Sequence, residues 1–392
     1  MKRTLTASGG AAIYLIAILV NLGVQLLGSV ALVVAGAVSG NDGVSSVLNY
    51  VLMALLQAGF LLTFALFVKK TDCGLAFPVR VLKWYDILLA VLAAGICVFC
   101  FIFPAQWFAV LLEKIGYNFS TEIPLDGALD VTLCVIVTVI IAPVCEELVF
   151  RGALLTGLTK KYGVIPSVIL SGLAFSLMHM NPEQTVYQFF MGCACAYLAI
   201  CSGSVLCPMI VHACNNLIAI IFEFTGTAFL DAFFTSYGVF AAVTVAFFIA
   251  GVTALYFIGR LMLKRERHGA GAGLVFDLKR VNADKTAQNP TENNENVTAF
   301  TDEIRQEPTE NNAEIAENID GVRQKRTENN DFAAATDPIK AEAALDEEEL
   351  AEGKARTPLL GKRSQAIYLG IGLFACLVVW ILVFAVNVAT LA

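Results

Sequence analysis

The chain has 392 residues, of which 57% are hydrophobic and only 15% are charged, and its formal net charge is −7. The apolar residues form runs of about twenty or more, which is the length that crosses a bilayer. Acidic residues gather in one polar segment and basic residues in short loops, so the charge pattern argues against a nucleic-acid partner. We therefore predict an all-α fold, a polytopic transmembrane helical bundle.

Nine apolar runs predict nine membrane-spanning helices, eight in a core and a ninth near the C-terminus. The run that starts at residue 131 carries charges in its middle, but it remains compatible with one helix of about thirty residues. The predicted spans are 11–38, 44–68, 87–103, 131–161, 163–180, 185–201, 205–222, 237–263 and 366–388.

Basic residues in the loops predict the orientation. If the spans alternate, nearly all of these residues fall on one side, whereas the short loops of the other side hold only Lys114. By the positive-inside rule that basic side is the cytoplasm, so we predict a multi-pass protein of the cell membrane with a cytoplasmic N-terminus. The basic residues are Lys2, Arg3, Lys69, Lys70, Arg80, Lys83, Lys160, Lys161, Lys264, Arg265 and Arg267.

Residues 269–365 differ from the rest because they are rich in Asn, Glu, Asp, Thr and Ala. Such a segment cannot bury enough apolar surface to become ordered, so it is predicted to be a disordered acidic cytoplasmic linker. Within it Thr-Glu-Asn-Asn recurs at residues 291, 309 and 327, which indicates local duplication rather than a solenoid.

Eleven cysteines do not predict disulfides, because nearly all of them fall in apolar runs, where cysteine acts as a small hydrophobic residue. Cys97 and Cys100 form a C-x-x-C pair, but no second pair and no histidine accompany it. A zinc or redox site at this pair is therefore the weaker interpretation.

Charged residues interrupt the run 131–161. A charge at the centre of a bilayer costs about 2.5–3.5 kcal/mol on insertion scales, so such residues usually face a protein interior and have a function. Glu147 and Arg151 are four residues apart, on one helical face, where they can form an ion pair. Glu146 points about a quarter-turn away and lacks that partner, which makes it a candidate general base.

Two of the three histidines, His179 and His212, also lie in predicted spans. A lone buried histidine is usually a structural residue. Here, however, Phe175 and His179 are four residues apart, and so are His212 and Asn216, so each pair presents one helical face.

Residue counts predict the depth of these side chains, because the turn 160–163 is the midpoint of an antiparallel hairpin. Glu146 lies as far before this turn as His179 lies after it, so two regular helices bring them to about the same depth. By the same count His212 lies nearer to the cytoplasmic turn. A tilted helix or a proline-induced break is needed to bring His212 level with the others.

These residues form a candidate site for acyl hydrolysis. Glu146 would take a proton from a water that His179 orients. His212 and Asn216 would donate hydrogen bonds to the developing oxyanion. Metal binding is the alternative, because Glu146, His179 and His212 are also the ligand set of some hydrolytic zinc sites, although no H-E-x-x-H motif is present.

Other classes of function have less support. A transporter or channel could contain the same buried charges as an ion-paired helix contact, but no inverted repeat is evident. No G-x-S-x-G motif indicates a nucleophilic serine. The predicted spans also lack the two aspartates that an intramembrane aspartyl site would need.

The same residues resemble three motifs of one family. Residues 146–152, 175–179 and 212–216 resemble the EExxxR, FxxxH and HxxxN motifs of the CAAX prenyl endopeptidase and bacteriocin-processing family, also called CPBP or Abi. The motifs occur in the family's order. The resemblance covers about residues 131–222, the four-helix catalytic core.

The resemblance implies an intramembrane endopeptidase of the glutamyl type, in which Glu147 and Arg151 hold the helix and the other four residues act as described above. It implies no cofactor, with zinc as the alternative because the family has often been labelled metalloprotease. The implied partners are the lipid bilayer and a membrane protein or peptide substrate, which is prenylated in eukaryotic members. A non-catalytic membrane immunity or scaffold protein of the same fold is the rival interpretation.

The chain is accordingly divided into five parts. These are the N-terminal spans 1–130, the CPBP-like core 131–223, the eighth span with its cytoplasmic end 224–268, the linker 269–365 and the C-terminal span 366–392.

Overall fold

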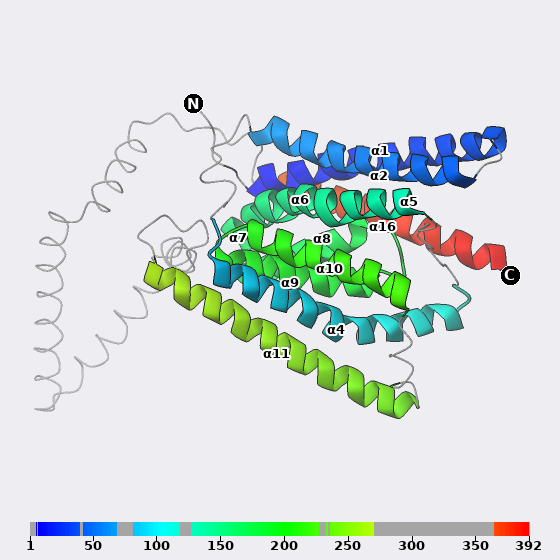
Figure 1. The fold of residues 1–392 in the computed structure, drawn as a ribbon. Coiled ribbons are helices and arrows are strands. Elements are labelled where there is room, and N and C mark those ends of the chain that lie inside the picture. Colours follow the sequence, from blue (N-terminus) through cyan, green and yellow to red (C-terminus); the bar gives the residue numbers. More distant parts are fainter. Residues whose placement is uncertain are drawn as a thin grey trace, which may run out of the picture. The chain divides into compact units, whose positions relative to one another are not determined.

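A computed structural model of the chain is built from helices and turns, with no strand in the part of the chain that it describes. Eight of the helices are long and apolar enough to cross a membrane, which confirms the predicted all-α, polytopic helical fold (Figure 1). All described residues belong to one compact unit. They are Leu5, 7–39, 42–68, 81–117, 127–226, Phe233, 236–269 and 364–391.

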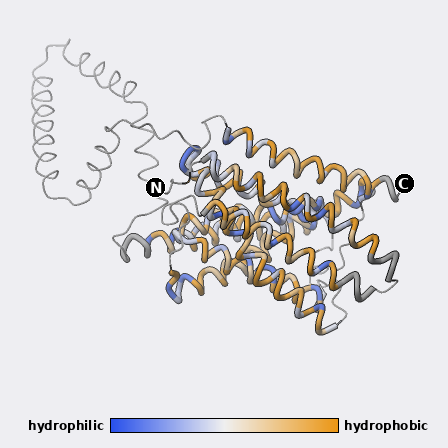
Figure 2. Tube along the Cα trace, turned by 90° about the horizontal axis from the view of Figure 1, so that it is seen from above, coloured by the Kyte–Doolittle hydropathy of each residue, from blue (hydrophilic) through white to orange (hydrophobic). Residues whose placement is uncertain are grey.

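Apolar residues cover most of the length of these helices (Figure 2). Many large apolar side chains are exposed, such as Leu27 at 72% and Phe374 at 67%. A soluble protein would bury most of these side chains, whereas helices in a bilayer contact lipid chains with their outer faces. The exposure therefore agrees with membrane insertion.

The first three helices agree with the predicted spans in number but not in every boundary. α1 (Ala7–Ser39) packs along α2 (Asp42–Val68). α4 (Trp84–Lys114) extends beyond the predicted span 87–103 and runs through Pro104. Proline removes only one backbone hydrogen bond, and membrane helices tolerate that loss because neighbouring groups compensate. The predicted end at residue 103 was therefore wrong.

The run that contains the charged stretch is continuously helical but changes its winding. It consists of α5 (Ala128–Cys134), the π-helix η1 (Val135–Ile141), α6 (Ala142–Glu147), the π-helix η2 (Leu148–Leu155) and α7 (Thr156–Tyr162). A π-helix has i→i+5 hydrogen bonds and is frequent at functional sites. Residue periodicity did not predict these two segments, which flank the two glutamates.

The next predicted span, 163–180, is a shorter helix than expected. α8 (Val164–Met178) has 15 residues and is thus about 22 Å long at 1.5 Å per residue, less than the hydrocarbon core of about 30 Å. α8 packs along α9 (Thr185–Ser202), and α10 (Leu206–Thr225) follows. The prediction that residues 163–180 cross the whole bilayer was therefore wrong.

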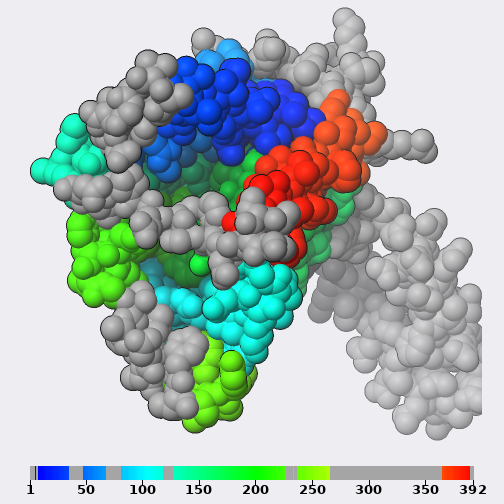
Figure 3. Space-filling model, turned by 90° about the vertical axis from the view of Figure 1, so that its right-hand side faces the viewer, coloured from blue at the N-terminus to red at the C-terminus, as the bar shows by residue number. Residues whose placement is uncertain are grey.

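The two remaining helices pack on different sides of these elements. α11 (Tyr237–Gly269) contacts α4 and α9, whereas α16 (Ser364–Leu391) contacts α1 and α8. Figure 3 shows α16 in red beside α1 in dark blue. The predicted linker, with its Thr-Glu-Asn-Asn repeats, lies almost entirely outside the described residues. The domain boundaries also stay predictions.

Two glycines allow α8 and α9 to approach closely. A Cβ atom built on Gly172 would lie 2.9 Å from the backbone nitrogen of Cys193 and 3.0 Å from the carbonyl oxygen of Phe189. A Cβ atom on Gly192 would lie 2.9 Å from the Cα atom of Gly172. Small residues at helix contacts of this kind let membrane helices pack backbone to backbone.

We expect Gly172→Ala to lower the free energy of unfolding, because the new methyl group would press on the backbone of α9. Overpacking typically costs about 1–3 kcal/mol, more than the gain of about 1 kcal/mol in helix propensity. Gly95→Ala is the control, since a Cβ atom there meets nothing within 4 Å and should leave the protein equally or more stable. Thermal unfolding of the purified protein in detergent measures both. Equal midpoints for the two variants would contradict the close packing.

Candidate functional site

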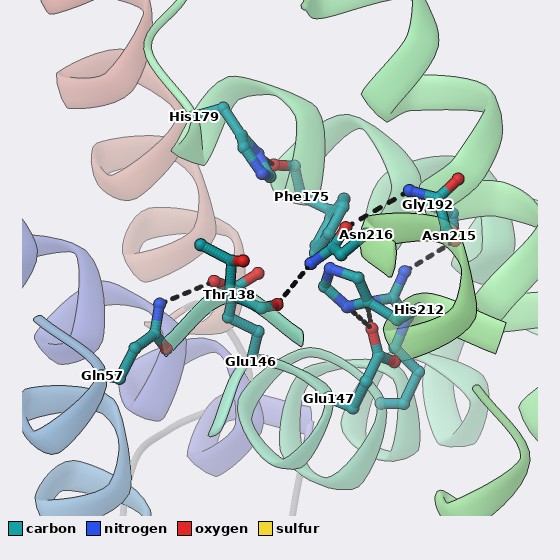
Figure 4. A network of polar contacts seen from close by, with 11 residues as sticks. Gln57, Thr138, Glu146, Glu147, Phe175, His179, Gly192, His212, Asn215 and Asn216 are labelled. Carbon is teal, nitrogen blue, oxygen red and sulfur yellow. Dashed lines mark hydrogen bonds and ion pairs between the residues drawn. The ribbon is translucent and has the colours of Figure 1, made fainter. Parts of the chain in front are cut away.

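Residues from four parts of the chain meet around the end of α6 (Figure 4). Glu146 and Glu147 are the last residues of α6, and Arg151 lies one turn later in η2. The other participants come from α2, from the C-terminal end of α8 and from α10. Three of these charged side chains are buried, with exposures of 6% for Glu146 and 0% for Glu147 and Arg151.

Glu147 and Arg151 form a buried ion pair, with 2.7 Å between Oε1 of Glu147 and Nη1 of Arg151. The guanidinium also donates from Nη2 to the carbonyl oxygen of Gly192 on α9, at 3.0 Å. Its carbon atom lies 4.6 Å from the centre of the Phe175 ring. Arg151 therefore links η2 to α8 and α9, and its charge is balanced where water is excluded.

His212 binds the same carboxylate from α10. Its Nδ1 atom lies 3.0 Å from Oε1 of Glu147. Because a carboxylate that pairs with arginine is ionised and can only accept, Nδ1 carries a hydrogen and donates. The other ring nitrogen, Nε2, is then an acceptor in the neutral ring and a donor in the imidazolium.

This contact shows that the residue count misjudged the depths of Glu147 and His212 relative to each other. The count placed His212 nearer to the cytoplasmic turn than the glutamates, whereas its ring contacts Glu147 directly. Part of the reason for this error is η2, which lies between Glu147 and the turn at residues 160–163. A π-helix takes more residues per turn and so advances the chain less per residue.

Glu146 has one hydrogen-bond partner that the sequence did not reveal. Its Oε1 atom accepts a hydrogen bond of 2.8 Å from Nε2 of Gln57 on α2, whereas its buried Oε2 atom has no partner in the described structure. The sequence left Glu146 without an ion-pair partner, and no ion pair of Glu146 occurs among the described residues, but the carboxylate does have this hydrogen-bond partner on α2. The sequence does contain an indication of this contact, because Gln57 is the one amide side chain in the apolar run 51–68.

His179 follows the last residue of α8. Its Nδ1 atom lies 2.9 Å from the carbonyl oxygen of Phe175, which can only accept, so Nδ1 carries the hydrogen. Nε2 of the neutral ring is then an acceptor. In Figure 4 the ring of His179 is drawn above Glu146 and Asn216.

Asn216, one turn after His212 on α10, anchors its amide to η1. Its Nδ2 atom donates a hydrogen bond of 2.7 Å to the carbonyl oxygen of Thr138, which uses one of its two hydrogens. Its Oδ1 atom accepts from Nδ2 of Asn215, whose own Oδ1 atom accepts a short hydrogen bond from Tyr187. The second amide hydrogen of Asn216 has no partner among the described residues.

The C-terminal helix supports the segment after His179. The indole nitrogen of Trp380 donates to Oγ1 of Thr185 at 2.7 Å, and Oγ of Ser176 donates to the carbonyl oxygen of Thr185 at 2.6 Å. Along the chain between Ser176 and Thr185, Met180 has a positive φ of 53°, which is uncommon for a residue with a side chain. α16 thus takes part in holding the turn that carries His179.

The proposed zinc ligands do not fit a metal ion in this arrangement. Each histidine keeps Nε2 available while Nδ1 is held by an oxygen atom, as is usual for a ligating histidine. However, no three side chains of His, Cys, Asp or Glu lie close enough together to hold a metal within the described ranges. This includes the alternative set of Glu146, His179 and His212, so we derive no chemical step through a metal.

The arrangement has the parts of a hydrolytic site. A carboxylate oxygen without a partner and a histidine nitrogen with a lone pair can together bind a water molecule and accept its proton. An amide hydrogen and the Nε2 atom of His212 can contact an oxygen that gains negative charge. The structure brings the six residues named from the sequence to one site and adds Gln57.

Comparisons with known proteins agree with the resemblance that the three motifs indicate. Residues 128–218 match the family model of the type II CAAX prenyl endopeptidase Rce1-like proteins. An uncharacterised protein of Mycoplasma capricolum is 45% identical over 58 residues, which cover 15% of this chain and 16% of that protein. YdiL of Bacillus subtilis, whose name marks it as a candidate membrane peptidase, is 25% identical over 104 residues, which cover 26% of this chain and 43% of that protein.

The similarity is thus confined to part of each protein, because the chain matches less than half the length of these relatives. No solved structure matches the chain. The matched segment contains all six candidate site residues from Glu146 to Asn216, but it contains neither Gln57 nor α16.

We expect Arg151→Ala to destabilise the protein by about 3 kcal/mol or more, because it removes the cation from a fully buried carboxylate. Arg151→Lys should restore only part of the loss, since lysine cannot donate to Glu147 and to the carbonyl of Gly192 with a planar fork. Arg260→Ala, at an exposed position of α11, is the matched control. Folded yield and thermal unfolding in detergent measure the effect. Wild-type stability of Arg151→Ala would show that the ion pair is incidental.

Proposed function

We propose, from the match of residues 128–218 to the type II CAAX prenyl endopeptidase Rce1-like family, that this chain is an intramembrane endopeptidase. At the level of the family, the matched segment is that of a CAAX-protease-like membrane peptidase. The observation that supports catalysis most directly is the buried carboxylate of Glu146, whose Oε2 atom has no partner, in a site that also holds a histidine with an available Nε2 atom.

In the proposed reaction, Glu146 is the general base. A water molecule donates one hydrogen bond to Oε2 of Glu146 and the other to Nε2 of His179. Glu146 takes the first proton while the oxygen attacks the carbonyl carbon of the peptide bond. The tetrahedral intermediate then collapses, Glu146 returns the proton to the leaving nitrogen, and the C–N bond breaks. The products are a carboxylic acid, which keeps the second proton of the water until it ionises in solution, and an amine.

His212 and Asn216 are the proposed oxyanion donors. Asn216 offers its second amide hydrogen. His212 offers a hydrogen from Nε2 only as an imidazolium, because Nδ1 already donates to Glu147. With His212 protonated, the buried groups comprise two carboxylates and two cations, so their charges balance. Balanced and hydrogen-bonded charges are the condition under which burial of ions is tolerated.

The proposed substrate is a peptide bond in a membrane protein or lipid-attached peptide. The reacting groups are buried among helices that are apolar enough to cross a membrane, so a substrate that is already in the bilayer can approach them. Lipid attachment is the substrate feature that the name of the matched family describes. Two rivals remain as outcomes of the tests below: a non-catalytic immunity or scaffold protein, and a zinc-dependent enzyme.

We expect Glu146→Gln to reduce cleavage by about 10²–10⁴-fold, the usual contribution of a general base. Glutamine keeps the size and the hydrogen bonds of the side chain but cannot take the proton of water, so folded yield should stay near normal. The assay is cleavage of a farnesylated peptide with a C-terminal CAAX sequence by purified protein in lipid vesicles. Glu113→Gln, at an exposed position near the end of α4, is the matched control and should retain full activity.

Combined variants and metal removal distinguish the proposed metal-free peptidase from a zinc-dependent enzyme and from a non-catalytic scaffold protein. His179→Ala should resemble Glu146→Gln, and the double variant should cost little more than either single change, because both residues act on one water. Activity that chelation abolishes and zinc restores would favour the zinc-dependent enzyme. Full activity of Glu146→Gln would remove catalysis from this site, and a wild-type protein that cleaves no such peptide would favour the scaffold.

We also propose that the N-terminus is cytoplasmic, on the basis of the lysine and arginine bias of alternate loops. Single cysteines that replace Glu223 and Lys161, in a cysteine-free background, should then react with a membrane-impermeant maleimide from opposite sides. Glu223→Cys should be labelled in intact cells and Lys161→Cys only after the membrane is opened. Labelling of Lys161→Cys in intact cells would reverse the orientation.

A further inference from the structure

Gln57 contacts the reacting carboxylate from outside the matched segment. It lies on α2, which precedes residue 128, and its side chain is buried, with an exposure of 8%. Its Nε2 atom donates to Oε1 of Glu146 at 2.8 Å. No other hydrogen bond to the Glu146 carboxylate occurs in the described structure.

A glutamine at this place is costly unless it has a role. The helix around it is apolar, and an amide in hydrocarbon needs partners for its hydrogens and its oxygen. Here only the nitrogen is paired, because Oε1 of Gln57 is buried without a partner. A leucine or methionine would pack on α6 without that cost, so packing alone does not account for the amide.

The geometry distinguishes the two oxygens of Glu146. Oε1 is held by Gln57, and Oε2 is buried without a partner. A carboxylate that is free to rotate would present either oxygen to water and in many orientations. A single donor on Oε1 removes that freedom and leaves Oε2 as the defined proton acceptor.

We propose that Gln57 is a positioning residue for the general base, which orients the Glu146 carboxylate so that Oε2 receives the proton of the attacking water. The proposal rests on the proposed function, since it assigns a partner to the same carboxylate. It extends the catalytic unit to α2, a helix outside residues 128–218. α2 contacts α6, η1 and η2, so it is held against the segment that it supports.

The expected effect is on the chemical step rather than on substrate binding. Misplacement of a reacting group, or loss of a residue that orients it, typically costs about 10- to 100-fold in rate. Gln57→Met should therefore lower kcat by that factor and leave KM nearly unchanged. Methionine preserves the length of the side chain and the helix but cannot donate. Gln57→Asn, which keeps the amide on a shorter side chain, should recover part of the rate.

The matched control is Gln25 on α1. Its Nε2 atom donates at 2.7 Å to Oδ1 of Asn21 on the same helix, so it is a hydrogen-bonded glutamine in another apolar helix. Gln25→Met should keep the wild-type kcat. The measurement is steady-state cleavage of the farnesylated CAAX peptide by each purified protein in vesicles of one fixed lipid composition.

A second measurement needs no substrate. Gln57→Met should lower the thermal unfolding midpoint in the wild-type background, but not in Glu146→Leu, where the carboxylate that it holds is gone. If the wild type cleaves the peptide and Gln57→Met keeps its kcat, the positioning role is wrong while the proposed function stands. If the wild type cleaves nothing, the proposed function fails for this substrate, and the unfolding data alone decide whether Gln57 holds Glu146. Equal effects of Gln57→Met in both backgrounds would overturn the inference.

Discussion

The carboxylate of Glu147 is the group on which the site depends. It is fully buried, and one of its oxygens receives both the guanidinium of Arg151 and the ring nitrogen of His212. An unpaired carboxylate in such a place would cost several kcal/mol, so both contacts have to be kept together. Arg151 in turn binds the backbone of α9. One anion thereby sets the relative positions of η2, α9 and α10.

Local backbone features make these contacts possible. Gly172 and Gly192 let α8 and α9 approach within a distance that a side chain would prevent, and the carbonyl group of Gly192 is the one that Arg151 reaches. The π-helices η1 and η2 change the winding on either side of the glutamates, and the carbonyl of Thr138 in η1 holds the amide of Asn216. The positions of the candidate site residues are therefore defined by packing and by helix geometry together.

Helices outside the matched segment complete the surroundings of the two residues that would handle water. Gln57 on α2 holds Glu146, and Trp380 on α16 holds the turn after His179. These supports come from positions 89 residues before Glu146 and 195 residues after Thr185 along the chain. A description limited to the three motifs would thus omit both of these contacts.

The sequence by itself determined the fold class, because a helix in lipid satisfies its own backbone hydrogen bonds and needs only a long enough apolar run. It also determined which residues to consider, because a charge or a histidine in such a run is costly and therefore conspicuous. The family match to residues 128–218 agrees with that selection of motifs. The spacing of four residues between Glu147 and Arg151 needed nothing beyond one turn of helix.

Only the tertiary structure decided which groups touch across helices. The partner of Glu146, the contact between His212 and Glu147, and the bracing of the turn after His179 join residues that are distant in the chain. Such contacts depend on the rotation and depth of each helix, which side-chain period does not specify. The residue pattern also did not predict three features of the helices themselves. These are the passage of α4 through Pro104, the shortness of α8 and the two π-helices. Neighbouring helices contribute to where a membrane helix can bend or change its winding, because they supply partners for the backbone groups that are freed there.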